Sequence, residues 1–185
     1  MADRGRVHDR AILDALEALA PQTIERIVWR VARKGRDPLR GAVANGRWNA
    51  VREFEVLYTS FSSEGALAEV GYRLSIEPIW PSRIEHEMHR IEVQTERNLR
   101  FADVASLAPL GVDPARYRSF DYATTQAIAA AANFLAFDGL IVPNARFDCG
   151  NLVIFTKRAP TLALAHTEPV DWEEWRRNRG RSSPG

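Results

Sequence analysis

The sequence has little cysteine, no long apolar run and almost no net charge, and each of these features excludes a class of protein. A single cysteine, Cys149, among 185 residues excludes an internal disulfide and is typical of a reducing compartment. No apolar run approaches the ~20 residues of a membrane-spanning helix. The formal net charge of +1 creates no overall field that would demand nucleic acid or a membrane as partner. Residues 1–10 mix acidic with basic side chains, unlike a signal peptide. We therefore expect a cytoplasmic protein that binds neither nucleic acid directly nor a membrane.

What remains is the composition of an ordinary globular protein. Hydrophobic residues make up 45% of the chain and charged residues 26%, and the length is sufficient to bury a core. We expect a single domain over residues 1–185 with its core at about 24–160. A helix at 9–20 would precede this core, and a flexible tail at 178–185 would follow it.

The pattern of apolar residues predicts a mixture of helices and strands. Helical spacing and capping residues predict helices over 9–20, 62–74, 124–137 and 171–177, of which 124–137 would be the longest. Short β-prone segments predict strands over 24–32, 54–59, 88–93, 99–101, 140–142 and 151–156, the last of these being the final core strand. We therefore expect an α+β fold in which a mixed or antiparallel sheet is flanked by helices.

One charge lies inside a segment that is expected to enter the core. Arg30 is embedded in the apolar strand 27–32. Burying an unpaired charge costs several kcal/mol, so the guanidinium must be paired or must face a ligand. A structural salt bridge and a bound anion are the two alternatives.

Four further polar residues follow Arg30 within apolar segments: Arg47, Tyr58, Ser60 and Glu69. Guanidinium groups suit phosphate oxygens, tyrosine rings stack on planar heterocycles, and a carboxylate can hold a ribose hydroxyl or a sugar cation. The set indicates a nucleotide site, and Gly46 would let the loop of Arg47 approach a phosphate closely.

Each of these residues also has a purely structural alternative. Arg47 can form a cation–π pair with its neighbour Trp48. Tyr58 can be a core tyrosine with its hydroxyl at the rim, and Ser60 can be a turn residue. Glu69 can pair with Arg73, four residues further along the same predicted helix.

Short motifs in a fixed order resemble the RES-domain toxins, a family named for an arginine, a glutamate and a serine. The resemblance covers about residues 26–158 and implies a fold similar to ADP-ribosyltransferase toxins, action on NAD, and a gene paired with an antitoxin. The motifs are Trp29-Arg30, Gly46-Arg47-Trp48-Asn49, Leu57-Tyr58-Thr59-Ser60, Ala66-Leu67-Ala68-Glu69, Thr125-Gln126, Phe137-Asp138-Gly139 with Val142-Pro143, and Gly150-Asn151-Leu152.

The resemblance implies a role for each of the polar residues. Arg30 and Arg47 would clamp the pyrophosphate of NAD. Tyr58 would stack on nicotinamide, and Glu69 would hold the ribose 2′-hydroxyl or the developing cation. Arg30, Tyr58 and Glu69 would therefore be the catalytic residues.

Two positions would add polar contacts to the nucleotide. One is Ser60. The other is Asn144, which stands after Val142-Pro143, where the family usually has serine. Asparagine can both donate and accept hydrogen bonds, so a contact with ribose or phosphate is expected there.

No metal site is expected. His86 and His89 resemble a metal-binding motif, but their spacing on a strand would point them to opposite faces. Cys149 has no neighbouring histidine and is expected to be a small core residue.

The implied function is that of a toxin in a toxin–antitoxin module. It would cleave the nicotinamide–ribose bond of NAD, its co-substrate, and pass ADP-ribose to a protein such as an enzyme of nucleotide biosynthesis, to phosphate or to water. The enzyme would be an ADP-ribosyltransferase, or an NAD glycohydrolase or phosphorylase, within the glycosyltransferase class. A helix-turn-helix antitoxin would cover the NAD site, with homo-oligomerisation of the complex as an option. The alternative is a non-catalytic interaction module whose arginines bind an acidic partner.

Overall fold

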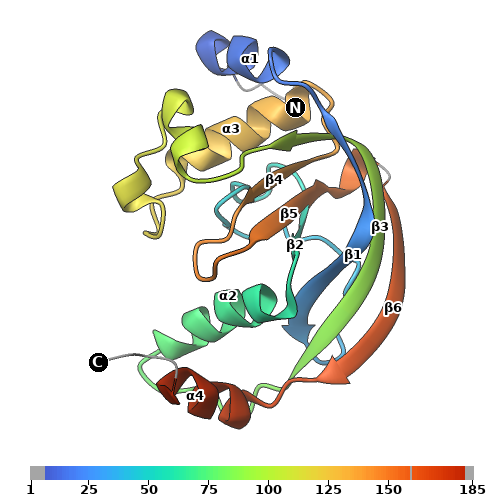
Figure 1. The fold of residues 1–185 in the computed structure, drawn as a ribbon, viewed down its shortest axis with the longest axis vertical. Coiled ribbons are helices and arrows are strands. Elements are labelled where there is room, and N and C mark those ends of the chain that lie inside the picture. Colours follow the sequence, from blue (N-terminus) through green and yellow to red (C-terminus); the bar gives the residue numbers. More distant parts are fainter. Residues whose placement is uncertain (1–6, 159, 182–185) are drawn as a thin grey trace.

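The computed structural model describes residues 7–158 and 160–181, and its centre is a six-stranded mixed sheet (Figure 1). Neighbouring strands follow the order β1-β2-β5-β4-β3-β6. β3 and β4 run parallel, whereas the other neighbours in the described residues are antiparallel. The predicted α+β class with a mixed sheet is therefore confirmed. The strands are β1 (Gln22–Arg33), β2 (Val56–Ser60), β3 (His86–Arg100), β4 (Gly139–Pro143), β5 (Gly150–Phe155) and β6 (Thr161–Pro169).

Five of the strands close into a ring, because β1 pairs with β3 as well as with β2. β6 pairs with β3 outside this ring, and Figure 1 shows β1, β3 and β6 curving together along one side of the molecule. β3 is one strand of 15 residues, whereas two separate strands at 88–93 and 99–101 were predicted. Polar residues in the middle of β3 interrupt its apolar pattern, so the sequence indicated two strands. In the structure these residues satisfy one another and β1: Thr95 donates to Asn98 Oδ1 at 3.1 Å, and the Asn98 amide donates to the Gln22 carbonyl on β1 at 2.8 Å.

β6 was not predicted at all, because 151–156 was expected to be the last strand of the core. Eight of the nine residues of β6 are exposed, and Leu162 alone is partly buried. A strand at the edge of a sheet that buries so little leaves almost no hydrophobic pattern in the sequence. The folded part of the chain therefore extends beyond the core boundary expected at residue 160.

Four α-helices lie around the sheet in the part of the chain that the structure describes, and each differs slightly from its prediction. They are α1 (Arg10–Glu17), α2 (Ser63–Ser75), α3 (Ala123–Phe134) and α4 (Trp172–Arg181), and three short 3-10 helices cover 105–110, 114–116 and 156–158. α2, with 13 residues, is longer than α3, with 12, because α3 stops before Ala136, whose φ is 61°. α4 continues to residue 181, so the tail expected at 178–185 is helical at its start, and residues 182–185 lie outside the described residues.

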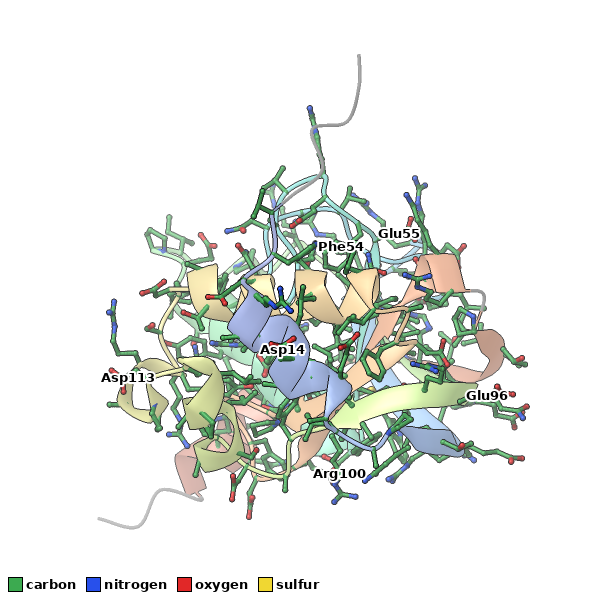
Figure 2. The ribbon with its side chains drawn as sticks, turned by 90° about the horizontal axis from the view of Figure 1, so that it is seen from above. Asp14, Phe54, Glu55, Glu96, Arg100 and Asp113 are labelled. Carbon is green, nitrogen blue, oxygen red and sulfur yellow. The ribbon has the colours of Figure 1, made fainter. Side chains whose placement is uncertain are left out.

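Successive side chains of a strand point to opposite faces of the sheet, so the interior contains two hydrophobic clusters. On β5, Leu152 and Ile154 belong to a cluster that draws residues from all five ring strands. Val153 and Phe155 face a larger cluster that includes residues of α1 and α3. Seen from above, α1 with Asp14 lies over this end of the molecule (Figure 2). Within the described residues, no helix is long and apolar enough to cross a membrane.

Candidate active site

A cleft of about 240 Å³ lies where β1, β2 and α2 meet three loop segments. The loops cover residues 42–48, 117–122 and 143–146, so distant parts of the sequence share one cavity. The structure brings five of the six predicted site residues together in its lining: Arg30, Arg47, Tyr58, Ser60 and Glu69.

Arg30 is a half-buried cation whose only hydrogen-bond partners in the described residues are carbonyl groups. Its Nη1 donates to the Tyr58 oxygen and its Nη2 to the Arg40 oxygen, both at 3.3 Å, while the buried Nε has no partner. Loss of solvent lowers the pKa of Arg30, and the nearby charge of Asp37 opposes this effect only in part. No carboxylate of the described residues forms an ion pair with it. The salt-bridge alternative is therefore not realised, and the guanidinium can accept an anion.

Arg47 is held by the segment 117–122. Its guanidinium lies over the ring of Tyr117 at 4.7 Å and over the ring of Tyr122 at 5.0 Å. The same group donates to the carbonyl oxygens of Tyr117 and Ser119. The cation–π partners are thus tyrosines across the cleft and not the neighbouring Trp48. These contacts orient the guanidinium without neutralising its charge.

The hydroxyl of Tyr58 points towards the loop that carries Arg47. The hydroxyl accepts the backbone N–H of Trp48 at 2.9 Å and donates to Asn49 Oδ1 at 2.6 Å, and burial raises its pKa. A Cβ at Gly46 would collide with this hydroxyl. The space beside Gly46 is therefore filled by Tyr58, whereas a phosphate was expected there. The ring of Tyr58 still lines the cleft.

Glu69 presents a carboxylate to the cleft from α2. Its Oε1 accepts the backbone N–H of Ala145 at 3.1 Å and the side-chain amide of Asn151 at 3.5 Å. Its Oε2 makes no hydrogen bond to any described residue. Arg73 lies four residues further along the helix, yet it forms no ion pair with Glu69 in this part of the chain. One carboxylate oxygen is therefore oriented by the protein and the other is available.

The structure corrects the prediction for Asn144, whose side chain does not line the cleft. Its Nδ2 donates to the Gly65 carbonyl at 3.2 Å and to Asn151 Oδ1 at 2.9 Å. Its Oδ1 accepts the N–H groups of Arg146 at 2.7 Å and Phe147 at 3.0 Å. These four bonds use its capacity, so Asn144 shapes the turn after β4 and has no free group for ribose or phosphate.

Ser60 lines the cleft and contacts Cys149, which is not part of the lining. The Ser60 Oγ is 3.3 Å from the Cys149 Sγ. Ser60 is almost fully buried, while Cys149 is only half-buried and is not the core residue that was expected.

Two arginines in the lining were not predicted as ligand-binding residues. Arg73 was considered only as a partner for Glu69, and Arg146 follows the turn at Asn144. Arg146 lies over the ring of Tyr72 at 3.5 Å and donates to the Arg118 carbonyl at 2.7 Å. With Arg30 and Arg47 they make four arginines against one glutamate, a formal excess of three positive charges in the cleft.

The histidines of β3 serve the packing of the sheet. His86 accepts a hydrogen bond from the Trp172 indole at 3.1 Å, and His89 lies 2.9 Å from the Thr167 hydroxyl. The described residues contain no group of three His, Cys, Asp or Glu that could hold a metal ion.

Comparison with known proteins identifies the family to which this chain belongs. The model of the RES domain family matches residues 27–176, which includes every residue of the cleft lining. The chain belongs to the RES-domain family. The family assignment made from the sequence motifs is therefore confirmed.

Comparison with individual proteins and structures relates this RES-domain chain to Mycobacterium tuberculosis. A probable NAD(+) phosphorylase of strain H37Rv is 33% identical over 133 residues, a match that covers 71% of this chain and 62% of the relative's own length. The fold resembles that of a chain in the crystal structure of the MbcT–MbcA toxin–antitoxin complex. The TM-score is 0.80 at 21% identity, over 93% of this chain and 98% of the other.

The cleft of this RES-domain chain is suited to an anionic ligand with planar groups. Its arginines can bind phosphate oxygens in a bidentate manner, and its tyrosines offer faces for stacking. A single carboxylate with one available oxygen can bind hydroxyl groups or stabilise a positive charge.

Proposed function

We propose that this protein is the toxin of a toxin–antitoxin module that cleaves the nicotinamide–ribose bond of NAD and transfers the ADP-ribosyl group to phosphate. The observation that carries the proposal is the unpaired, half-buried Arg30 in a cleft with one carboxylate, Glu69. A relative described as a probable NAD(+) phosphorylase supports both the substrate and the acceptor.

In this proposal, Arg30 and Arg47 bind the pyrophosphate of NAD. Both lack a carboxylate partner in the described residues. Arg30 is fixed by two carbonyl groups, and Arg47 by carbonyl groups and tyrosine rings. Charge-assisted hydrogen bonds from fixed guanidinium groups are about twice as strong as neutral ones. The two arginines would hold the dinucleotide so that its nicotinamide ribose lies beside Glu69.

Glu69 would act on the sugar. Departure of nicotinamide leaves positive charge on the ribose, as in glycoside cleavage through an oxocarbenium-like state. The available oxygen of Glu69 would bind the ribose 2′-hydroxyl or stabilise that charge, while the Ala145 N–H keeps the other oxygen in place. The ring of Tyr58 would stack on nicotinamide. No strong base is needed, because nicotinamide leaves as a neutral molecule.

We also propose that an antitoxin inhibits the enzyme by covering this cleft. Carboxylates of the partner would pair with the unpaired arginines and compete with NAD for them. The resemblance in fold to a protein solved as a toxin–antitoxin complex supports this arrangement. The complex should then fail to bind NAD, which calorimetric titration of the free and the complexed protein would show.

The proposed activity is tested by incubating the purified protein with NAD in the presence and absence of phosphate, with chromatography of the products. We expect nicotinamide and ADP-ribose-1″-phosphate in equal amounts, and much slower release without phosphate. ADP-ribose as the main product in both buffers would assign the acceptor to water. Label transferred from radioactive NAD to a protein in lysate would assign it to a protein.

A further inference from the structure

Arg73 and Arg146 line the cleft but are not needed for the pyrophosphate of NAD. A pyrophosphate diester carries two negative charges, which Arg30 and Arg47 suffice to balance. Arg73 and Arg146 also lack carboxylate partners in the described part of the chain. We propose that Arg73 and Arg146 form a second anion subsite that holds the acceptor phosphate beside Glu69. This inference rests on the proposed function and adds the residues that select the acceptor.

Arg73 is placed next to the reacting sugar by the geometry of α2. It lies four residues after Glu69, which puts the two Cβ atoms about 5–6 Å apart on one face of the helix. The Arg73 side chain is exposed and makes no hydrogen bond to a described residue, so its N–H groups are available. Its charge acts on Tyr58, lowering the pKa of that hydroxyl more than Arg47 does. Arg73 therefore lines the cleft as an exposed cation near Glu69.

Arg146 lines the same cleft from the segment after β4. One face of its guanidinium is stacked on Tyr72, the residue directly before Arg73, and its Nη2 is fixed by the Arg118 carbonyl. Phe120 adds a second, more distant ring contact at 5.9 Å. The plane of the group is thereby set, while Nε and Nη1 make no hydrogen bond within the described residues. A planar guanidinium with these two N–H groups unbonded can donate a pair of hydrogen bonds to a phosphate dianion.

The chemical step balances with phosphate as the sole co-reactant. The bond between the ribose C1″ and the pyridine nitrogen breaks, and its electron pair leaves with nicotinamide. A phosphate oxygen supplies the pair for the new C1″–O bond, and the proton remaining on the phosphate is released to solvent. Arg73 and Arg146 would hold that oxygen in line and prevent water from taking its place.

The test is steady-state kinetics of nicotinamide release with phosphate and NAD varied separately. Arg73→Gln and Arg146→Gln should each raise the KM for phosphate about tenfold or more, because each removes a charge-assisted bond. The KM for NAD should change less than about threefold. Arg146→Lys keeps the positive charge but lacks the planar guanidinium, so its KM for phosphate should lie between those of the wild type and Arg146→Gln. Arg100→Gln removes the same charge from an exposed position of β3 outside the cleft and should change neither constant (Figure 2).

The outcomes separate this inference from the activity itself. If the wild-type protein releases nicotinamide equally fast with and without phosphate, the proposed acceptor is wrong and the subsite is wrong with it. If release depends on phosphate but either glutamine variant, folded by circular dichroism, keeps the wild-type KM for phosphate, the two-arginine subsite alone is overturned. Parallel rises in both KM values would overturn it too, since they would place the arginines on the pyrophosphate.

Discussion

The hydroxyl of Tyr58 donates a hydrogen bond of 2.6 Å to Oδ1 of Asn49. Asn49 is fully buried, and its amide nitrogen in turn donates to the Ala44 carbonyl at 2.7 Å. The same hydroxyl accepts the N–H of Trp48. Through these bonds, strand β2 holds the loop that carries Arg47, so the position of one proposed ligand-binding residue depends on another.

Replacing Tyr58 by phenylalanine should therefore cost stability as well as activity. The change leaves the Asn49 oxygen and the Trp48 N–H without this partner, which we expect to lower the free energy of unfolding by about 1–3 kcal/mol. Urea denaturation measures the change. Tyr72→Phe is the matched control, because the Tyr72 hydroxyl makes no hydrogen bond to a described residue. Equal midpoints for Tyr58→Phe and the wild type would show that the anchoring bonds have no energetic weight.

Arg30→Met should separate binding from folding. An unpaired cation in a half-buried position does not stabilise the fold, so the free energy of unfolding should stay unchanged or rise. NAD turnover should fall about 10–100-fold, the value of a charge-assisted hydrogen bond. Thermal melting tests the predicted stability, and nicotinamide release tests the predicted loss of NAD turnover. A variant that melts far below the wild type would restore the structural role for Arg30.

Glu69→Gln keeps the shape of the side chain and removes its charge. The amide oxygen can still accept the Ala145 N–H, so the melting temperature should remain near that of the wild type. The kcat for nicotinamide release should drop about 100-fold or more, because the carboxylate is proposed to stabilise charge in the transition state. If kcat is unaffected while only the KM for NAD rises, Glu69 binds substrate without stabilising the transition state.

The buried histidines of β3 should make stability depend on pH. Burial lowers the pKa values of His86 and His89, so the unfolded chain binds protons more readily than the folded chain. The free energy of unfolding should therefore fall as the pH drops below about 6.5. Urea midpoints at pH 7.5 and 5.5 measure this dependence. His86→Asn should show a smaller difference, whereas His166→Asn, at an exposed position, should match the wild type.

The site was more predictable than the sheet around it. Four site residues stand out in the sequence because they are polar residues in apolar segments: Arg30, Arg47, Tyr58 and Glu69. Each belongs to a short motif, and all four line one cleft in the structure. The closed ring could not be predicted, since it depends on the pairing of β1 with β3, more than fifty residues apart in the sequence.

Other features left no signal that sequence reasoning could use. The direction of the Asn144 side chain is decided by Gly65 and Asn151, which approach it only in the fold. Arg73 resembled a surface partner of Glu69 because helical spacing permits that pair. Its place in the cleft follows from the way α2 packs against β1 and β2, which periodicity alone does not specify.

The phosphorus NMR spectrum of NAD incubated with the purified protein in phosphate buffer tests the central claim most directly. Cleavage at the nicotinamide–ribose bond with transfer to phosphate predicts that the pyrophosphate signals persist while one new phosphate monoester signal appears. The new signal should grow in step with free nicotinamide in the wild type and about 100-fold or more slowly with Glu69→Gln. An unchanged NAD spectrum with no nicotinamide would contradict the account and favour a non-catalytic module whose arginines bind an acidic partner.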